Sequence, residues 1–224
     1  GDLVENGRIL SQWKNFFELS DPLLRNTPFY PALGNHERNS NHYFDFFALP
    51  GKERYYSFDY GPAHFVVLDS NGNYKSDDTF LKWLKRDLAA TQKPFTFAVY
   101  HHPAVTCTFT ELRRFSAAQM YSIWGKIFEQ GRVSFALQGH NHNYQHAEKN
   151  GVTYITSGGA GAPLYPLGKK IPELKNGRVV NHFVHFQVTN DKVTVKVIDI
   201  EGKVSWTGIS VLVVQSESQL VDGS

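Results

Sequence analysis

Four short polar segments carry residue types that bind metal ions. Their members are Asp2, Asn35 with His36, His101 with His102, and His140 with His142. Imidazole and carboxylate donors together suit Zn, Fe or Mn, and an amide oxygen favours a hard cation. Each segment alone is a weak signal, because Asp and Asn after Gly are common turn residues and short His motifs often bind nothing. Their combination in one chain predicts a metal site.

Apolar segments that predict buried strands precede three of these groups. The predicted strands cover residues 29–33, 95–100 and 133–137. Ligand-binding loops of α/β proteins lie at the carboxyl ends of strands, so we expect the polar groups to meet at one edge of a sheet. On an extended chain the side chains of His140 and His142 point to the same side, and the two can therefore serve adjacent ions.

The remaining elements follow from periodicity and turn residues. Residues 55–70 predict a hairpin that turns at Gly61 and Pro62, and Pro22 is expected to close the first helix. The predicted helices cover residues 9–19, 77–90 and 116–130. From Val152 onward the strand-like segments are VTYITSGG, HFVHFQV, KVTVKVIDI and KVSWTGISV. This order predicts two packed sheets flanked by helices.

Composition limits the classes of protein and partner. The chain has 224 residues, 41% of them hydrophobic, which suits one packed domain. The net charge of +2 comes from scattered Lys and Arg, so we expect no nucleic-acid partner and no anionic membrane. Cys107 is the single cysteine, which excludes an intramolecular disulfide and a cysteine zinc knuckle. No apolar run approaches the ~20 residues that cross a bilayer.

The order GD, GNHE, HHP and GHNH resembles the signature of calcineurin-like metallophosphoesterases, and the chain is most similar to the purple acid phosphatase-like branch. The similarity extends to YFDFFALPGKERYYSFDYGPAHFVVLDSN and GHNHNYQHAEKNGVTYITSGGAG. It implies an α/β fold, a four-layer α/β/β/α sandwich of two mixed sheets flanked by helices. We expect the metallophosphoesterase domain over residues 1–215, lacking the first strand-helix unit, and a polar tail over residues 216–224.

The resemblance also implies a role for each polar residue. Asp2 bridges two divalent or trivalent ions, Fe, Mn or Zn. Asn35, His101 and His140 complete one ion's shell, and His142 belongs to the other. His36 is not a ligand; it contacts a phosphate oxygen or protonates the leaving alkoxide. The implied reaction is direct hydrolysis of a phosphate monoester or diester of a small molecule by a metal-activated hydroxide.

Two departures from the family pattern stand out. An upstream Asp-x-His motif is absent, so the second ion has only Asp2 and His142, fewer than the three protein ligands of a typical catalytic site. Glu5 occupies the position of a metal-binding Tyr in purple acid phosphatases, and we leave it out of the site. We therefore expect the domain to be N-terminally incomplete.

Other polar residues are expected near the cleft or within the fold. Those expected to contact substrate or support the ligands are His102, Asn71, Tyr144 and His146. Those expected to be structural or exposed are His64, His182 and His185. The glycines Gly158, Gly159 and Gly161 predict a sheet turn rather than a phosphate cradle, because no Gly-Lys-Ser/Thr follows.

Three other hypotheses stand beside hydrolysis by this chain alone. One is an inactive or incomplete metal-binding module, and another is a nuclease or nucleotide pyrophosphatase of the same superfamily. In the third, the missing strand is supplied by a separate chain. A nuclease would favour a basic groove, which the mild charge does not indicate. The resemblance favours an extracytoplasmic or secreted protein, with a cytoplasmic location as the alternative.

Overall fold

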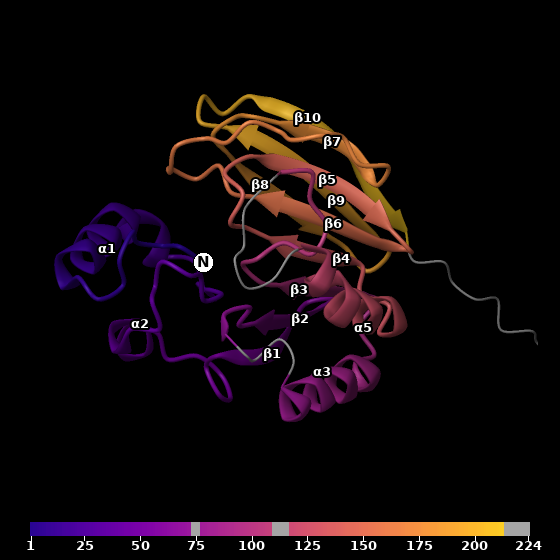
Figure 1. The fold of residues 1–224 in the computed structure, drawn as a ribbon, viewed down its shortest axis with the longest axis horizontal. Helices are drawn as coiled ribbons and strands as arrows, with labels where there is room; N and C mark the ends of the chain where they lie inside the picture. The colour runs from indigo at the N-terminus through magenta and orange to yellow at the C-terminus, as the bar shows by residue number, and fades with distance from the viewer. Residues whose placement is uncertain (73–76, 109–116, 213–224) are drawn as a thin grey trace, which may run out of the picture.

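The computed structural model describes residues 1–72, 77–108 and 117–212, and the side chains of residues 205–212 are outside the description. Its strands form a seven-stranded sheet of order β1-β2-β3-β4-β6-β5-β7 and a three-stranded sheet of order β10-β9-β8 (Figure 1). The strands of the large sheet are β1 (Tyr55–Tyr60), β2 (Ala63–Leu68), β3 (Phe95–Val99), β4 (Phe135–Gln138), β5 (Tyr144–Lys149), β6 (Val152–Ser157) and β7 (Leu174–Arg178). The small sheet consists of β8 (His182–Val188), β9 (Lys192–Asp199) and β10 (Val204–Leu212).

The large sheet is mixed, which confirms the α/β prediction. Strands β2, β3, β4 and β6 are parallel, whereas β1, β5 and β7 pair antiparallel with their neighbours. The hairpin of β1 and β2 turns at Gly61 and Pro62 as predicted. Gly61 has φ +54° at the first central position, where a tight hairpin turn requires a residue that tolerates positive φ.

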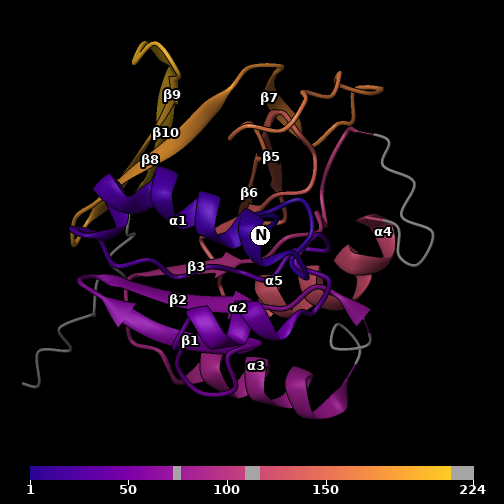
Figure 2. The ribbon, with the colours of Figure 1, turned by 90° about the vertical axis from the view of Figure 1, so that its left-hand side faces the viewer.

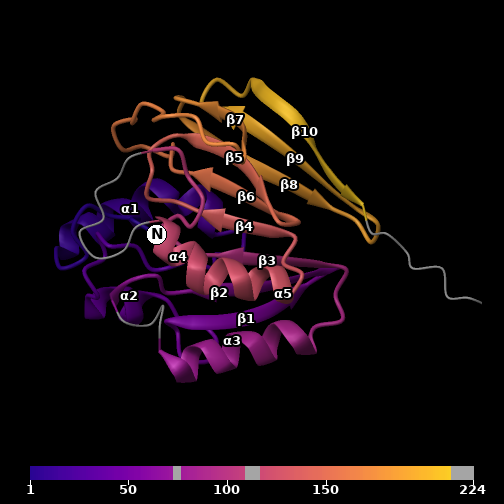
Figure 3. The same ribbon diagram turned by 45° about the vertical axis from the view of Figure 1, so that its right-hand side comes forward.

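The small sheet packs on one face of the large sheet and is antiparallel throughout. Alternate residues of β9 point inward, because Val193, Val195 and Val197 are fully buried. They pack against Phe97 and Phe135 of the central strands. This apolar layer lies between the two predicted sheets, whose arrangement is seen in Figure 3.

Helices cover the opposite face of the large sheet (Figure 3). The fully buried side chains there include Phe80 and Leu84 of α3 and Trp124 and Phe128 of the helical segment 117–130. Asp77 caps α3, because its carboxylate accepts a hydrogen bond from Phe80 N (2.9 Å). The helical elements are α3 (Asp78–Ala90), α4 (Ala117–Met120), a π-helical turn (Tyr121–Gly125) and α5 (Lys126–Gln130). Ser116, the first residue of the predicted third helix, lies outside the described residues.

The N-terminal helices α1 (Leu10–Leu24) and α2 (Asn41–Phe46) lie beside the end of the sheets at which the N-terminus is found (Figures 1 and 2). Trp13 is fully buried between them and packs on Tyr43 and Phe47. Its indole Nε1 donates to Gly7 O (2.7 Å). Trp13 therefore fixes α1 to the loop that carries Asp2. No described helix has the length and apolarity needed to cross a membrane.

One helix end and one strand were predicted wrongly. The helix α1 continues through Pro22 to Leu24 instead of ending at residue 19. Pro22 lies in the last turn, and the carbonyl of Glu18 that loses its donor belongs to an exposed residue, so water can replace the bond. The segment 29–33 forms no strand in either sheet. Pro31 lacks an N–H, and its carbonyl accepts from the hydroxyls of Tyr43 (2.9 Å) and Tyr56 (3.0 Å) instead of a strand.

Candidate metal centre

Side chains from all four polar segments converge on one point at the carboxyl ends of β3 and β4. His101 Nε2 lies 3.0 Å from Asp2 Oδ2 and 2.9 Å from Asn35 Oδ1. It also lies 3.1 Å from His140 Nδ1, which is 3.0 Å from Asn35 Oδ1. Four donor atoms from segments far apart in sequence thus form one compact cluster, and the predicted meeting of these residues at one sheet edge is what the structure shows.

The cluster has the dimensions of a metal shell. Bonds of about 2.0–2.2 Å to one ion place ligand atoms at right angles about 2.8–3.1 Å apart. A single imidazole proton on His101 Nε2 can serve only one of its three neighbours, whereas a cation can be shared by all. The donor set of carboxylate, amide and two imidazoles suits Zn, Fe or Mn. The residues present therefore fit the ion that the resemblance implies.

The protonation states of the cluster favour a cation. Burial lowers the pKa of His101, although the hydrogen bond to Asp2 opposes this shift. Burial is the main cause that lowers the pKa of His140 to about 4, and the positive charge of His101 contributes to the same shift. Burial acts to raise the pKa of Asp2, but the hydrogen bonds and positive charges of His101 and His36 together outweigh it, so the pKa is lowered. Neutral imidazoles and an ionised carboxylate are the forms that bind metal.

Two of the four cluster residues have left-handed backbones. Asp2 has φ 59° and His140 has φ 64°. Residues other than Gly pay about 1–2 kcal/mol for this conformation, and such strain is concentrated at functional sites. The strain at Asp2 and His140 is consistent with side chains that are held in place for a ligand.

Glu37 links two of the segments, and no role was predicted for it. Its carboxylate is fully buried. Oε2 accepts from Asp2 N (2.9 Å) and Gly34 N (2.6 Å), and Oε1 accepts from Leu3 N (2.7 Å). The approach needs a glycine, because a Cβ on Gly34 would collide with the Asp2 carboxylate. A Glu three residues after Gly in a ligand loop could have signalled this bridge, since a buried carboxylate requires several donors.

Asn71 supports the Asn35 loop from the other side. Its Nδ2 donates to the carbonyls of Leu33 and Gly34 (3.2 Å each) and to Asp69 Oδ1 (2.9 Å). Asp69 is fully buried and also pairs with Arg54 Nη1 (3.1 Å). The structure thus places Asn71 behind the ligand loop, where it holds the backbone next to Asn35.

His36 and His142 flank the cluster. His36 N donates to Asp2 Oδ1 (2.8 Å), and His36 Nδ1 donates to Glu5 O (2.7 Å). His142 lines the same cleft as Asp2, His101 and His140. Its Nδ1 donates to Pro163 O (2.8 Å), and its ring stacks on Tyr165 (4.1 Å between centroids). In both histidines Nδ1 donates to a backbone carbonyl, so Nε2 is the ring nitrogen that can bind an ion or exchange a proton.

His102 lies closer to the cluster than a purely supporting residue would need to. Its ring centroid is 4.8 Å from that of His140. The ligating nitrogens of His101, His102 and His140 all lie within 4.8 Å of one another, a group that could hold an ion. His102 Nδ1 bonds with Ser70 Oγ (2.8 Å). Its assignment to substrate or ligand support stays a prediction.

Tyr144 and His146 are not brought to the cluster. Both belong to strand β5, which was not predicted, and neither lines the cleft that contains Asp2, His101 and His140. Tyr144 is fully buried and packs in the apolar layer between the sheets. His146 is buried as well, with Nε2 3.3 Å from Glu148 Oε1. The prediction that these two residues line the cleft therefore has no support in their positions.

Buried amides fasten the loop after His102 to the adjacent strands. Gln138 Oε1 accepts from Tyr100 Oη (3.0 Å) and Ala104 N (2.8 Å). Gln145 Oε1 accepts from Cys107 N (2.8 Å). Both glutamines are buried, so each bond to the loop backbone is protected from water.

The histidines that were expected to be structural include His64, which bridges Asp59 and Asp87 far from the cluster.

The profile of calcineurin-like phosphoesterases matches residues 1–144. The chain belongs to this family. It is 25% identical to an Arabidopsis thaliana protein named "Probable inactive purple acid phosphatase 1" over 73% of this chain and 34% of that protein. It is also 25% identical to a Hordeum vulgare "Nucleotide pyrophosphatase/phosphodiesterase", over 77% of this chain and 59% of that protein.

A solved purple acid phosphatase from Lupinus luteus has the same fold, with a TM-score of 0.82 at 18% identity. The match covers 95% of this chain and 45% of the lupin protein. These similarities confirm the purple acid phosphatase-like branch of the family. The chain spans between about a third and three fifths of the length of the two curated relatives named above.

Proposed function

We propose that this chain carries a metal-dependent site that hydrolyses phosphate esters. The observation that supports this most is the cluster of Asp2, Asn35, His101 and His140, whose donor atoms lie 2.9–3.1 Å from His101 Nε2 or from one another. Family membership supports phosphate esters as the substrate class.

The four cluster residues would hold one ion, with the carboxylate of Asp2 as its anionic ligand. When bound, a divalent or trivalent ion draws negative charge from phosphate oxygens and acidifies water. We propose that a second ion is held by Asp2 and His142, which line one cleft. Fe, Mn and Zn all suit these donors.

We propose His36 as the proton donor or phosphate-binding residue. Its Nδ1 proton is committed to Glu5 O (2.7 Å), which fixes the tautomer and leaves Nε2 for exchange with substrate. The backbone N–H of His36 donates to Asp2 Oδ1 (2.8 Å), so His36 is held beside the carboxylate proposed to bind the ions. Direct attack by water needs no Ser or Cys nucleophile, and none stands in the cluster.

A comparison of variants tests these roles. His101→Ala should remove both metal and hydrolysis of p-nitrophenyl phosphate. His36→Ala should lower turnover about 10²–10⁴-fold while the metal content, measured by mass spectrometry, stays unchanged. If His36→Ala stripped the metal, its assignment would be wrong. Wild-type protein that holds metal without turnover would contradict hydrolysis and favour the inactive-module reading.

A diesterase or pyrophosphatase is the second candidate. The similarity to the Hordeum vulgare nucleotide pyrophosphatase/phosphodiesterase favours it. Parallel assays with p-nitrophenyl phosphate and bis-p-nitrophenyl phosphate separate the two, since only a diesterase cleaves the second compound efficiently. A location outside the cytoplasm stays a prediction from the same resemblance.

A further inference from the structure

A groove runs along the open edge of β1, away from the metal cluster. It lies between β1, the loop at Pro50–Lys52 and the helix α3. In Figures 1 and 3, β1 forms the margin of the large sheet and α3 runs beside it. The floor is aromatic, because Tyr55 and Trp83 pack with their ring centroids 4.8 Å apart. Trp83 is only partly buried, so an apolar side chain could rest on it.

The backbone of β1 offers hydrogen bonds to this groove. Tyr60 pairs with Ala63 across a two-residue turn, so these two residues form a hydrogen-bonded pair. Alternation along the strand then directs the N–H and C=O groups of Tyr55 and Ser57 away from β2. Among the described strands β1 has β2 as its single neighbour. An edge of this kind accepts an additional strand.

The groove is positively charged. Lys52, Lys82 and Arg86 line it, and none of its described lining residues is acidic. The side chains of Lys82 and Arg86 form no ion pair with any residue in the described ranges, and Lys52 Nζ lies 5.6 Å from the Tyr55 ring centroid. Cations without acidic partners beside an open strand edge favour an acidic partner.

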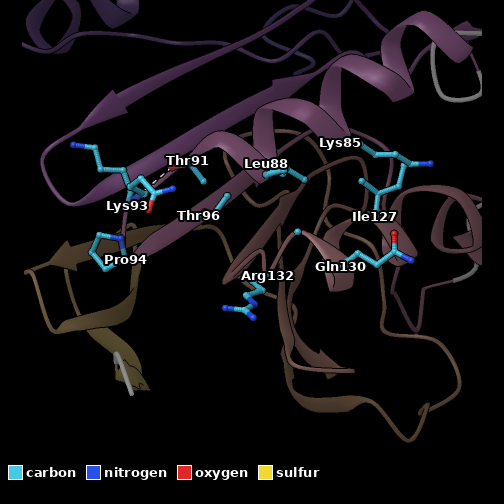
Figure 4. A pocket seen from close by; sticks show the side chains of 12 residues that line it. Lys85, Leu88, Thr91, Lys93, Pro94, Thr96, Ile127, Gln130 and Arg132 are labelled. Atoms are coloured by element: carbon cyan, nitrogen blue, oxygen red, sulfur yellow. Dashed lines mark hydrogen bonds between the residues drawn. The ribbon is translucent and has the colours of Figure 1, made fainter. Parts of the chain in front are cut away.

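A second hollow, between the ends of α3 and α5, is cationic but lacks these features. Its cations are Lys85, Lys93 and Arg132, whose side chains point in different directions (Figure 4). Lys93 Nζ already donates to Gly61 O (3.0 Å). This hollow presents no open strand edge. A substitution in this second hollow is therefore a control: it changes a surface charge without affecting a strand edge that could pair with a peptide.

We propose that the β1 edge is a docking site for an extended, acidic protein segment that adds a strand to the sheet. Its backbone would pair with Tyr55 and Ser57, an apolar side chain would contact Trp83, and its carboxylates would meet Lys82 and Arg86. A second copy of this chain fits less well, because pairing of two β1 edges would bring the same cations together. The proposal is independent of the phosphatase site.

A synthetic peptide of alternating Glu and Val tests the proposal at low ionic strength. Fluorescence anisotropy should show binding, and hydrogen exchange should show slowed exchange at the amides of Tyr55 and Ser57. The double variant K82E/R86E should weaken binding on the order of tenfold. The control Lys85→Glu, on the same helix but in the other hollow, should leave the affinity unchanged. Hydrolysis of p-nitrophenyl phosphate should be the same in all variants.

Backbone pairing is tested by a peptide of identical sequence with methylated amide nitrogens, which keeps the charges but cannot donate. It should bind at least about tenfold more weakly. The proposal is overturned if the wild-type protein does not bind the acidic peptide, or if the methylated peptide binds equally well. Equal weakening by Lys85→Glu would overturn it too. So would tighter binding of an oligothymidylate than of the peptide at the same sites, since that result identifies a general polyanion surface.

Discussion

At the scale of single residues, the cluster proposed to bind metal depends on groups that do not belong to it. The Glu37 carboxylate accepts three backbone N–H groups from the two loops that carry Asp2 and Asn35. Asn71 holds the same Asn35 loop from the opposite side, and Asp69 accepts a hydrogen bond from the Asn71 amide. These contacts hold the donor atoms at the spacing of metal ligands before any ion is bound. Less conformational entropy of the loops is then lost when an ion binds.

Replacing Glu37 by Gln tests this support. Gln has nearly the same shape, but its NH₂ group would face buried N–H donors, so we expect unfolding free energy to fall by about 2 kcal/mol. Urea denaturation in the presence of a chelator measures this loss independently of metal. The control Glu18→Gln changes an exposed carboxylate on α1 and should stay within about 0.5 kcal/mol of wild type. Equal stability of the two variants would contradict the assigned role of Glu37.

The backbone strain at His140 gives a second residue-scale prediction. His140→Gly and His140→Ala both remove the imidazole, and both should lose the metal. Only Gly relieves the positive φ of 64°, so the Gly variant should be about 1 kcal/mol more stable than the Ala variant without metal. Chemical denaturation in chelator provides the comparison. A less stable Gly variant would show that this backbone is not strained.

At the scale of elements, the β1–β2 hairpin is joined to α3 by His64. Its Nδ1 lies 2.7 Å from Asp59 Oδ1, and its Nε2 lies 2.9 Å from Asp87 Oδ2. Asp87 also accepts from Ser57 Oγ (2.7 Å). The bond to Asp87 is the main cause that raises the pKa of His64, with Asp59 adding to it and burial opposing it. Lys93 is the other charge nearby, 3.8 Å from Asp59 Oδ2.

A raised pKa in the folded state makes this link dependent on pH. The stabilisation is complete below the unfolded pKa of about 6.5 and is lost as pH rises through the higher folded value. Wild type should therefore lose more unfolding free energy between about pH 6 and pH 9 than His64→Gln does. The variant His185→Gln, at an exposed position of β8, should follow the wild-type profile. Parallel profiles for wild type and His64→Gln would contradict the link.

The elements also show what the sequence could and could not predict. The strands β3 and β4 end two residues before His101 and His140, because their compact apolar runs stop there, and this pattern was sufficient to predict the convergence. Strand β5 was missed because its sequence YQHAEK has no β-branched residue, and its place depends on pairing with β6 and β7.

The segment 29–33 shows the opposite error. It is apolar enough to predict a strand, yet Pro31 and the Tyr hydroxyls bonded to its carbonyl take the place of strand pairing. Glu37 and the buried glutamines Gln138 and Gln145 were overlooked because a buried polar residue leaves no periodic signal. Their partners are backbone groups, whose positions only the folded chain defines.

At the scale of the whole molecule, the packed sheets and helices bring all four polar segments together at the carboxyl ends of β3 and β4. Metal binding should therefore stabilise the folded chain as a unit. At a free ion concentration 100-fold above Kd, linkage gives about 2.7 kcal/mol of stabilisation. Thermal unfolding with and without Zn²⁺ or Mn²⁺ measures this gain. His101→Ala should show no increase in Tm on adding metal, and an increase equal to that of wild type would contradict the assignment.

The most direct test of the central claim is the metal content of the chelator-stripped chain after titration with Zn²⁺ or Mn²⁺. Calorimetry should show at least one equivalent bound by wild type and by the control His185→Ala, and little or none by His101→Ala or His140→Ala. The assignment of these residues as metal ligands is contradicted if wild type binds no ion, or if the cluster variants bind as many equivalents with the same affinity as wild type.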